Sequence, residues 1–139
     1  MQSTTMQNKA AVLRFNKEVI EQGNLNSFKE LVADDVSNHA APPGTPKGPE
    51  SMRYFIMDIL RPAFPGITVE ILEQIAEGDK VTTRKELHAV HTGTFMGIPA
   101  SGKKVTIEVI DIIRLRDGQY VEHWGMSNLS DIVAQLKAV

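Results

Sequence analysis

One stretch decides the fold of this chain: KVTIEVIDIIRLRDGQYVEHWGM, residues 104–126. Apolar and polar residues alternate from Lys104 to Leu115, as expected of a half-buried β-strand. Asp117-Gly118 follows, a dipeptide that favours a hairpin turn because glycine tolerates the positive φ that such turns need. A second alternating run, Gln119 to Met126, comes next. The stretch therefore predicts two long antiparallel strands that are neighbours in one sheet.

Two further alternating runs precede this hairpin. The first carries its apolar residues at Ile67, Val69, Ile71 and Ile75. A turn signal, Glu77-Gly78-Asp79, leads to a second predicted strand from Lys80 to Val90, which we expect to continue through His91 to Phe95 past a kink at Gly93. Pro99 to Gly102 predicts the turn into the long strand.

The first third of the chain and its last residues have helical spacing. Ala11, Val12, Phe15 and Val19 recur at helix spacing before Gly23, and Asn24 or Asn26 can cap a short second helix with Phe28, Leu31 and Val32. The proline-rich segment 41–48 breaks the pattern, and Pro49 suits the first turn of a third helix. Its apolar stripe is Met52, Phe55, Ile56, Ile59 and Leu60, ended by Pro62 and Pro65. Asn128 or Ser130 can cap a closing helix with Ile132, Val133 and Leu136.

The element order is three helices, four strands and one helix. Successive strands joined by tight turns are antiparallel, so the predicted class is α+β, a curved antiparallel sheet with helices on one face. Residues 1–139 form one predicted domain, and this length buries a core without disulfides or metals. Apolar residues make up 42% and charged residues 23%, as in an ordinary globular protein.

Composition also limits the partners. The net charge is −2 and no basic face is visible, so nucleic-acid binding is not expected. The chain has no cysteine, which excludes thiol catalysis and disulfides. No apolar run approaches the length of a membrane span, and residues 1–7 lack the layout of a secretion signal. We therefore expect a soluble, cytoplasmic protein.

Asp111 is the most informative single residue. It interrupts an apolar run, residues 109–113, and burying an unpaired carboxylate is costly, so a polar pocket is predicted around it. Counting back from the turn places Asp111 opposite Trp124, with His123 and Gly125 as diagonal neighbours. We predict a catalytic pair in which Asp111 fixes the tautomer of His123, and the imidazole removes a proton from a carbon next to a carbonyl.

An alternative for these residues is purely structural. In it, His123 is a half-buried strand residue and Asp111 is paired with Arg84 or Arg114. Arg84, Glu86 and His88 share one face of the second strand, and Arg84 and His88 can line the same cavity as Asp111. His88 and His91 point to opposite faces of a strand, so no metal site is expected.

Trp124 is predicted to face away from His123, on the outer side of the sheet. Ile110, Ile112 and Met126 share that side, and together they form an apolar patch that favours a homodimer interface. The alternative is that Trp124 packs under the C-terminal helix.

The ordered set of motifs resembles the SnoaL-like polyketide cyclases, within a cone-shaped superfamily that includes ketosteroid isomerases and limonene epoxide hydrolases. The matching segments are Gly23 to Asp35 with Asn38-His39, Lys47 to Glu50, Ala63 to Gly66, Glu77 to Val81, His91 to Pro99, Ser101 to Lys103, Asp111 to Arg114, Asp117-Gly118 and Glu122 to Trp124. The resemblance implies a sheet wrapped into a cone, with a ligand pocket inside it that the N-terminal helices close, and dimers through the outer sheet face.

The resemblance also bears on the pocket residues. It implies that Asn38 and His39 lie at the pocket mouth, while Phe55 and Met96 can form its wall. His91 completes the predicted substrate-binding set with Arg84 and His88. An epoxide-hydrolase arrangement, in which an arginine between two acids activates water, would use Asp111, Arg84 and Glu86.

Three positions depart from the cyclase pattern. The family's acid/base aspartate would stand at Gly125, a second carboxylate at Asn128 and a histidine at Asp111. Either Asp111 has taken over the acid/base role, or the chain is not a cyclase of that kind. The favoured expectation is a cofactor-free enzyme that acts on a hydrophobic carbonyl-bearing or cyclic small molecule through His123 and Asp111. The alternatives are a water-activating hydrolase and a non-catalytic binding module.

Overall fold

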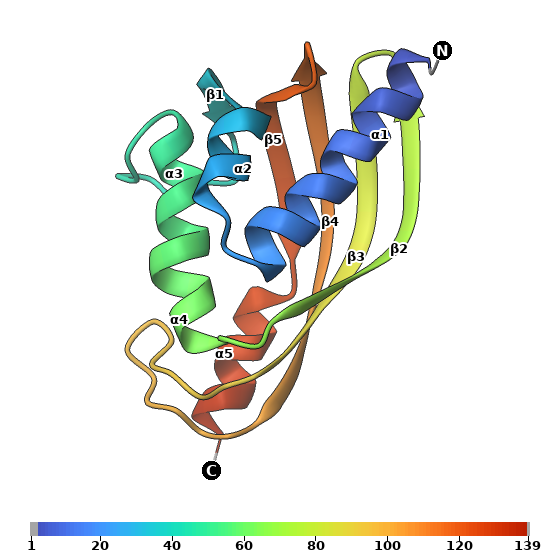
Figure 1. Ribbon diagram of the computed structural model, residues 1–139. Coiled ribbons are helices and arrows are strands. Elements are labelled where there is room, and N and C mark those ends of the chain that lie inside the picture. The colour runs from blue at the N-terminus through green and yellow to red at the C-terminus, as the bar shows by residue number, and fades with distance from the viewer. Residues whose placement is uncertain (1–2, 139) are drawn as a thin grey trace.

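The computed structural model describes residues 3–138 and shows a curved five-stranded sheet partly wrapped by helices (Figure 1). The strand order is β1-β5-β4-β3-β2, and all neighbours are antiparallel except β1 and β5, which run parallel. The strands are β1 (Val32–Asn38), β2 (Thr68–Glu77), β3 (Lys80–Val90), β4 (Lys104–Arg116) and β5 (Gln119–Ser127). The predicted α+β class with a curved sheet is confirmed. Met1, Gln2 and Val139, the ends of the predicted domain, lie outside the described residues.

The helices follow the sequence signals closely. They are α1 (Thr4–Arg14) with its π-helical continuation η1 (Phe15–Glu21), α2 (Leu25–Leu31), α3 (Pro49–Arg53) with η2 (Tyr54–Leu60) and α4 (Arg61–Ala63), and α5 (Leu129–Lys137). Asn24 caps α2 by accepting the Ser27 N–H, and Pro49 opens α3, both as predicted. Within residues 3–138, no helix is both long and apolar enough to cross a membrane.

The first strand, β1, was not predicted. Val32 was expected at the end of the second helix, but the helix ends at Leu31 and the chain continues as a strand to Asn38. Val32 and Val36 are buried there. β-branched side chains fit a pleated surface better than a helix, and pairing with β5 satisfies this backbone. The sheet therefore has five strands, not four, and one of its pairings is parallel.

Two local irregularities also correct the predictions. β3 ends at Val90, so His91 to Phe95 do not continue it; these residues enter a loop whose backbone bonds to Ala63 and Lys103. A bulge in β2 between Ile71 and Glu73 reverses the alternation, which leaves Ile75 63% exposed rather than on the buried face.

The two faces of the sheet differ sharply. On β3, Val81, Thr83, Lys85 and Leu87 are buried, whereas the alternating residues that include Arg84 and His88 are open to solvent. We call the first side the inner face and the second the outer face. Helix α1 crosses the inner face in Figure 1, with contacts to β2 and β3. The core lies between this face and the helices, and it includes Phe15, Ile56, Phe64, Ile113 and Tyr120.

Candidate functional site

Asp111 lies on the inner face and is only 6% exposed. Its Oδ2 is 3.2 Å from Nζ of Lys85, a residue equally buried on the adjacent strand. The same ammonium donates to Oδ1 of Asn16 on η1, 2.6 Å away, and the Asn16 amide donates to the Val12 carbonyl. Asp111 is therefore paired with a lysine, not with Arg84 or Arg114.

Only one oxygen of Asp111 is satisfied in this way. Among the described residues, Oδ1 is buried and has no hydrogen-bond partner. The charge of Asp111 acts on the fully buried Tyr120, whose pKa is raised well above its usual value by burial first and by Asp111 second. Tyr120 therefore stays neutral in the physiological range, and Asp111 has an acceptor oxygen to spare.

His123 is held by Asn38 rather than by Asp111. Its Nδ1 is 2.8 Å from Asn38 Oδ1, and the same oxygen accepts the N–H of Ala40 at 3.1 Å. An amide oxygen only accepts, so Nδ1 of His123 carries the hydrogen and Nε2 presents a lone pair. Burial lowers the pKa of His123, an effect that the nearby charge of Asp111 opposes. The neutral ring, with Nε2 free to accept a proton, is the form expected of a general base.

Gly125 lies directly opposite Asp111 and beside His123. The pairing corrects the predicted register, which placed Trp124 opposite Asp111, because a bulge in β5 between the partners of Arg114 and Leu115 shifts the strand by one residue. A Cβ at position 125 would lie 3.3 Å from His123 Nε2 and 3.7 Å from Asp111 Cβ. Because position 125 has no side chain, the His123 ring lies close over its backbone, next to Asp111.

Three residues near Asp111 are half-buried rather than buried: His123 and Gly125 on β5, and Val109 on β4. The site is assembled from η1, β1, β3, β4 and β5, and its polar members are Asn16, Asn38, Lys85, Asp111 and His123.

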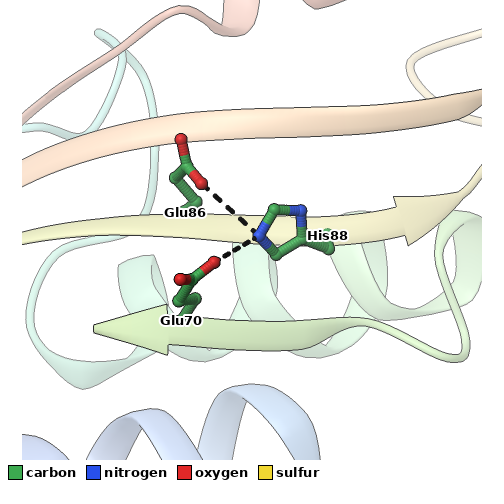
Figure 2. Close-up of side chains that lie close together, drawn as sticks. All are labelled: Glu70, Glu86 and His88. Carbon is green, nitrogen blue, oxygen red and sulfur yellow. Dashed lines mark hydrogen bonds and ion pairs between the residues drawn. The ribbon is translucent and has the colours of Figure 1, made fainter. Parts of the chain in front are cut away.

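Arg84, Glu86 and His88 stand on the outer face, away from Asp111. Arg84 pairs with Glu73 at 2.6 Å, and His88 Nε2 lies 3.0 Å from Glu70 and 3.5 Å from Glu86 (Figure 2). The predicted cavity shared by Arg84, His88 and Asp111 is therefore not formed. The epoxide-hydrolase set of Asp111, Arg84 and Glu86 is separated by the sheet itself.

The Glu70, Glu86 and His88 cluster has ligand types that a divalent metal accepts, with atoms within 4.8 Å of one another. All three side chains are open to water, and His88 is 41% exposed. The contacts of the imidazole with the two carboxylates account for this geometry without a cation. The cluster is a solvated group on the sheet surface, on the opposite side from Asp111.

His39 also belongs to the outer face. Its ring stacks on Trp124 at a centroid distance of 4.9 Å, and its Nε2 lies 2.9 Å from Glu122. Asn38 and His39 are neighbours in sequence, yet only Asn38 enters the inner site. Trp124 borders a shallow outer hollow of about 730 Å³ with Ile75, Thr82 and Ile112 among its lining residues.

The remaining predicted binding residues lie apart from Asp111. His91 is fully buried and accepts the Ser101 N–H at Nδ1, with its ring against Phe64. Met96 is 62% exposed in the following loop and Phe55 is 37% exposed on η2. His91 therefore anchors the loop of residues 91–103.

Sequence reasoning missed Lys85 and Asn16. Lys85 shares its strand face with Leu87, and this alternation was a signal that a charged residue points into the core. Asn16 follows Val12 by four residues on the buried side of the first helix, which was the corresponding signal there.

Comparisons with known proteins agree with this architecture. A candidate SnoaL-like polyketide cyclase from Jannaschia sp. CCS1 superposes with a TM-score of 0.88 at 24% identity, covering 100% of this chain and 97% of the other. IdmH, a candidate polyketide cyclase from Streptomyces antibioticus, gives 0.81 at 29% identity, covering 95% and 99%. AclR from Streptomyces galilaeus, described as a candidate hydroxylase, gives 0.82 at 24% identity, covering 95% and 96%.

No curated protein sequence matches the chain at a significant level. The model of one protein family, the SnoaL-like polyketide cyclases, matches residues 10–136, nearly the whole chain. This match agrees with the motifs noted in the sequence, with the curved sheet and with the structural neighbours. This chain belongs to the SnoaL-like polyketide cyclase family.

Proposed function

We propose that the protein is a cofactor-free acid/base enzyme that acts on a hydrophobic, carbonyl-bearing or cyclic small molecule, with His123 as its general base. The observation that carries this proposal is the tautomer of His123, which Asn38 fixes with the Nε2 lone pair beside Gly125. A neutral imidazole with a lowered pKa is available to accept a proton at neutral pH.

The reaction is a proton transfer. His123 Nε2 takes a proton from the carbon next to a substrate carbonyl, the C–H electron pair moves into an enolate, and the imidazolium returns the proton to carbon or oxygen. Asp111 would stabilise the imidazolium, because its negative charge favours the protonated ring. In this proposal Asp111 supplies the carboxylate that family members carry at the position of Gly125.

Deuterium exchange tests the proposal without knowledge of the natural substrate. The protein is incubated in D₂O with cyclohexanone or 2-tetralone, and loss of the α-proton NMR signal is compared with the rate in buffer. We expect the wild type to accelerate exchange and His123→Gln to lose about 10²–10⁴-fold of that effect. His39→Gln, the same change on the outer face, should retain it. Ketone binding without exchange would support a binding module instead, and exchange that survives in His123→Gln would refute His123 as the base.

We also propose that the protein forms a homodimer through the outer face of β4 and β5. Ile110 and Met126 are paired across these strands, as are Ile112 and Trp124. Ile110 is 51% exposed and Met126 is 82% exposed, so the patch is apolar and open to water. A second copy of the chain offers the same patch around a twofold axis, which is the usual symmetry of small homo-oligomers.

A further inference from the structure

We propose that Asp111 Oδ1 is the atom by which the inner site recognises a hydroxyl group of its ligand. The inference deepens the proposed function by assigning a specificity-determining residue, and it rests on the same inner site. The two carboxylate oxygens of Asp111 have different surroundings. Oδ2 faces the Lys85 ammonium at 3.2 Å, whereas Oδ1 has no partner among residues 3–138.

A buried carboxylate oxygen without a donor is costly. An unsatisfied buried acceptor loses its hydration without recovering a hydrogen bond, and the loss is larger for a charged group. The Lys85 ammonium, which also donates to Asn16 Oδ1 at 2.6 Å, contacts only Oδ2 of Asp111. The pair thus keeps Asp111 in one orientation, with Oδ1 left to accept from outside the protein.

In this proposal the donor approaches Asp111 beside Gly125. This glycine is the direct cross-strand partner of Asp111 and has no side chain to supply a hydrogen bond. It is half-buried, and the His123 ring lies beside it, with Nε2 3.3 Å from the position that a Cβ would take. His123 Nε2 is also an acceptor, because Asn38 keeps the ring hydrogen on Nδ1. The surroundings of Gly125 thus include two acceptor groups and no side-chain donor from these residues.

This arrangement selects ligands by their hydrogen-bond donors. A hydroxyl group satisfies Oδ1 with a charge-assisted bond, which is about twice as strong as a neutral one. A ketone or ether oxygen in the same place brings two acceptors together and leaves Oδ1 unpaired. Sites with a buried polar group reject ligands that lack its partner much more strongly than apolar pockets reject a change of size. The ligand class is therefore an apolar, carbonyl-bearing or cyclic molecule that also carries a hydroxyl group.

A matched pair of probes tests this inference: 2-naphthol and 2-methoxynaphthalene, which differ only in the hydroxyl hydrogen and a methyl group. Their dissociation constants are measured by calorimetry at a pH where the naphthol is neutral. We expect the wild type to bind the naphthol at least about 100-fold more tightly, within the range of such discrimination. 2-Ethylnaphthalene, which has no oxygen, should bind as weakly as the ether and thus control for size.

Asp111→Asn should reduce this preference at least tenfold, because the charge-assisted bond is lost. Glu86→Gln, the same chemical change on the outer face, should leave the preference unchanged. Equal binding of naphthol and ether by the wild type, or no binding of either, overturns the inference, and neither result requires Asp111→Asn to fold. A naphthol preference that persists in a folded Asp111→Asn also overturns it.

The result of this binding experiment does not depend on the result of the deuterium-exchange assay. A hydroxyl preference without deuterium exchange, also on the hydroxylated ketone 6-hydroxy-2-tetralone, would support the recognition by Asp111 while refuting His123 as a base. Exchange without a hydroxyl preference would do the opposite.

Discussion

His123 and Asn38 are register partners on the parallel strands β5 and β1, and their side chains meet with Nδ1 and Oδ1 2.8 Å apart. The Ala40 N–H bonds to the same Asn38 oxygen, so the orientation of the amide is fixed by the backbone turn that follows β1. The one strand that the sequence did not predict thus determines which nitrogen of His123 can act as a base.

The first prediction concerns this tautomer. In the wild type at pH 8, long-range ¹H–¹⁵N NMR spectra should show His123 with a protonated Nδ1 and an unprotonated Nε2. Asn38→Leu removes the acceptor, so the ring should shift toward a mixture of both tautomers. Any exchange activity should fall with it. Ser37→Ala, an adjacent exposed position on β1, should change neither signal. A wild-type ring protonated at Nε2 would contradict the assignment.

The second prediction concerns stability and pH. Burial lowers the pKa of His123 in the folded protein below its usual value of 6.5, so the unfolded chain binds a proton more readily. The stabilisation from the neutral ring is complete above pH 6.5 and is lost as pH falls through the lowered pKa. Urea unfolding at pH 7.5 and 5.5 should show a larger loss for the wild type than for His123→Gln, by up to about 1.4 kcal/mol per pH unit. Equal losses would show that His123 does not contribute.

The third prediction concerns the buried ion pair. Lys85→Met leaves the Asp111 carboxylate buried without a counter-charge, which should cost about 3–5 kcal/mol in the free energy of unfolding. Replacing both residues, as Lys85→Met with Asp111→Leu, should cost much less than the sum of the single changes. Denaturant titrations of the four proteins measure this coupling. Arg84→Met breaks an exposed pair with Glu73 and serves as the control, with little expected effect. Additive effects of the two buried changes would refute the coupling.

The fourth prediction concerns the loop that His91 anchors. A Cβ on Gly93 would collide with the Pro62 carbonyl oxygen, so Gly93→Ala must move the loop away from α4. We expect a loss of about 1–3 kcal/mol of stability, typical of forced overpacking. Gly66→Ala is the matched control, since a Cβ there would meet nothing within 4 Å. Thermal unfolding measures both variants, and equal midpoints would contradict the close approach.

The fifth prediction concerns assembly. Sedimentation velocity over a range of concentrations should show a dimer, and Met126→Lys should shift it toward monomer because a charge then lies within the apolar patch. Met6→Lys changes another exposed methionine, 55% exposed on α1, and should leave the dimer intact. A wild type that stays monomeric at every concentration would refute the interface.

The strands around the predicted hairpin agree closely with the structure because their alternation is uninterrupted. β3 begins at Lys80 as predicted and ends at Val90 without the expected continuation to Phe95, and β4 and β5 extend the predicted runs by one residue each. Two of the failures, the exposure of Ile75 and the register of β5, have a common cause. A bulge in each strand shifts the pairing by one residue, and the sequence alternation does not reveal it. The bulge in β5 moved Gly125, not Trp124, opposite Asp111.

The site was predicted in part for a similar reason. The apolar context of Asp111 indicated its inward orientation, and the structure confirms that orientation. Its partners come from strands and helices distant in sequence, so local patterns could not identify Asn16 or Asn38 as contacts. Arg84 and His88 were predicted to line the same cavity as Asp111. Alternation shows which residues of one strand share a face, but not which face of the neighbouring strand lies on the same side of the sheet. Only cross-strand pairing, such as Thr83 with Asp111, shows which faces coincide.

The parallel pairing of β1 with β5 has a consequence for synthesis of the protein. β1 comprises residues 32–38, but the strand that pairs with it in the described part of the chain comprises residues 119–127. A nascent chain on the ribosome must therefore carry an unpaired strand until about 80 further residues have emerged and β5 can pair with it. Such an open edge is a template for association with other chains, and the late closure slows folding. Chaperone contact with the growing polypeptide is thus most valuable before Ser127 leaves the exit tunnel.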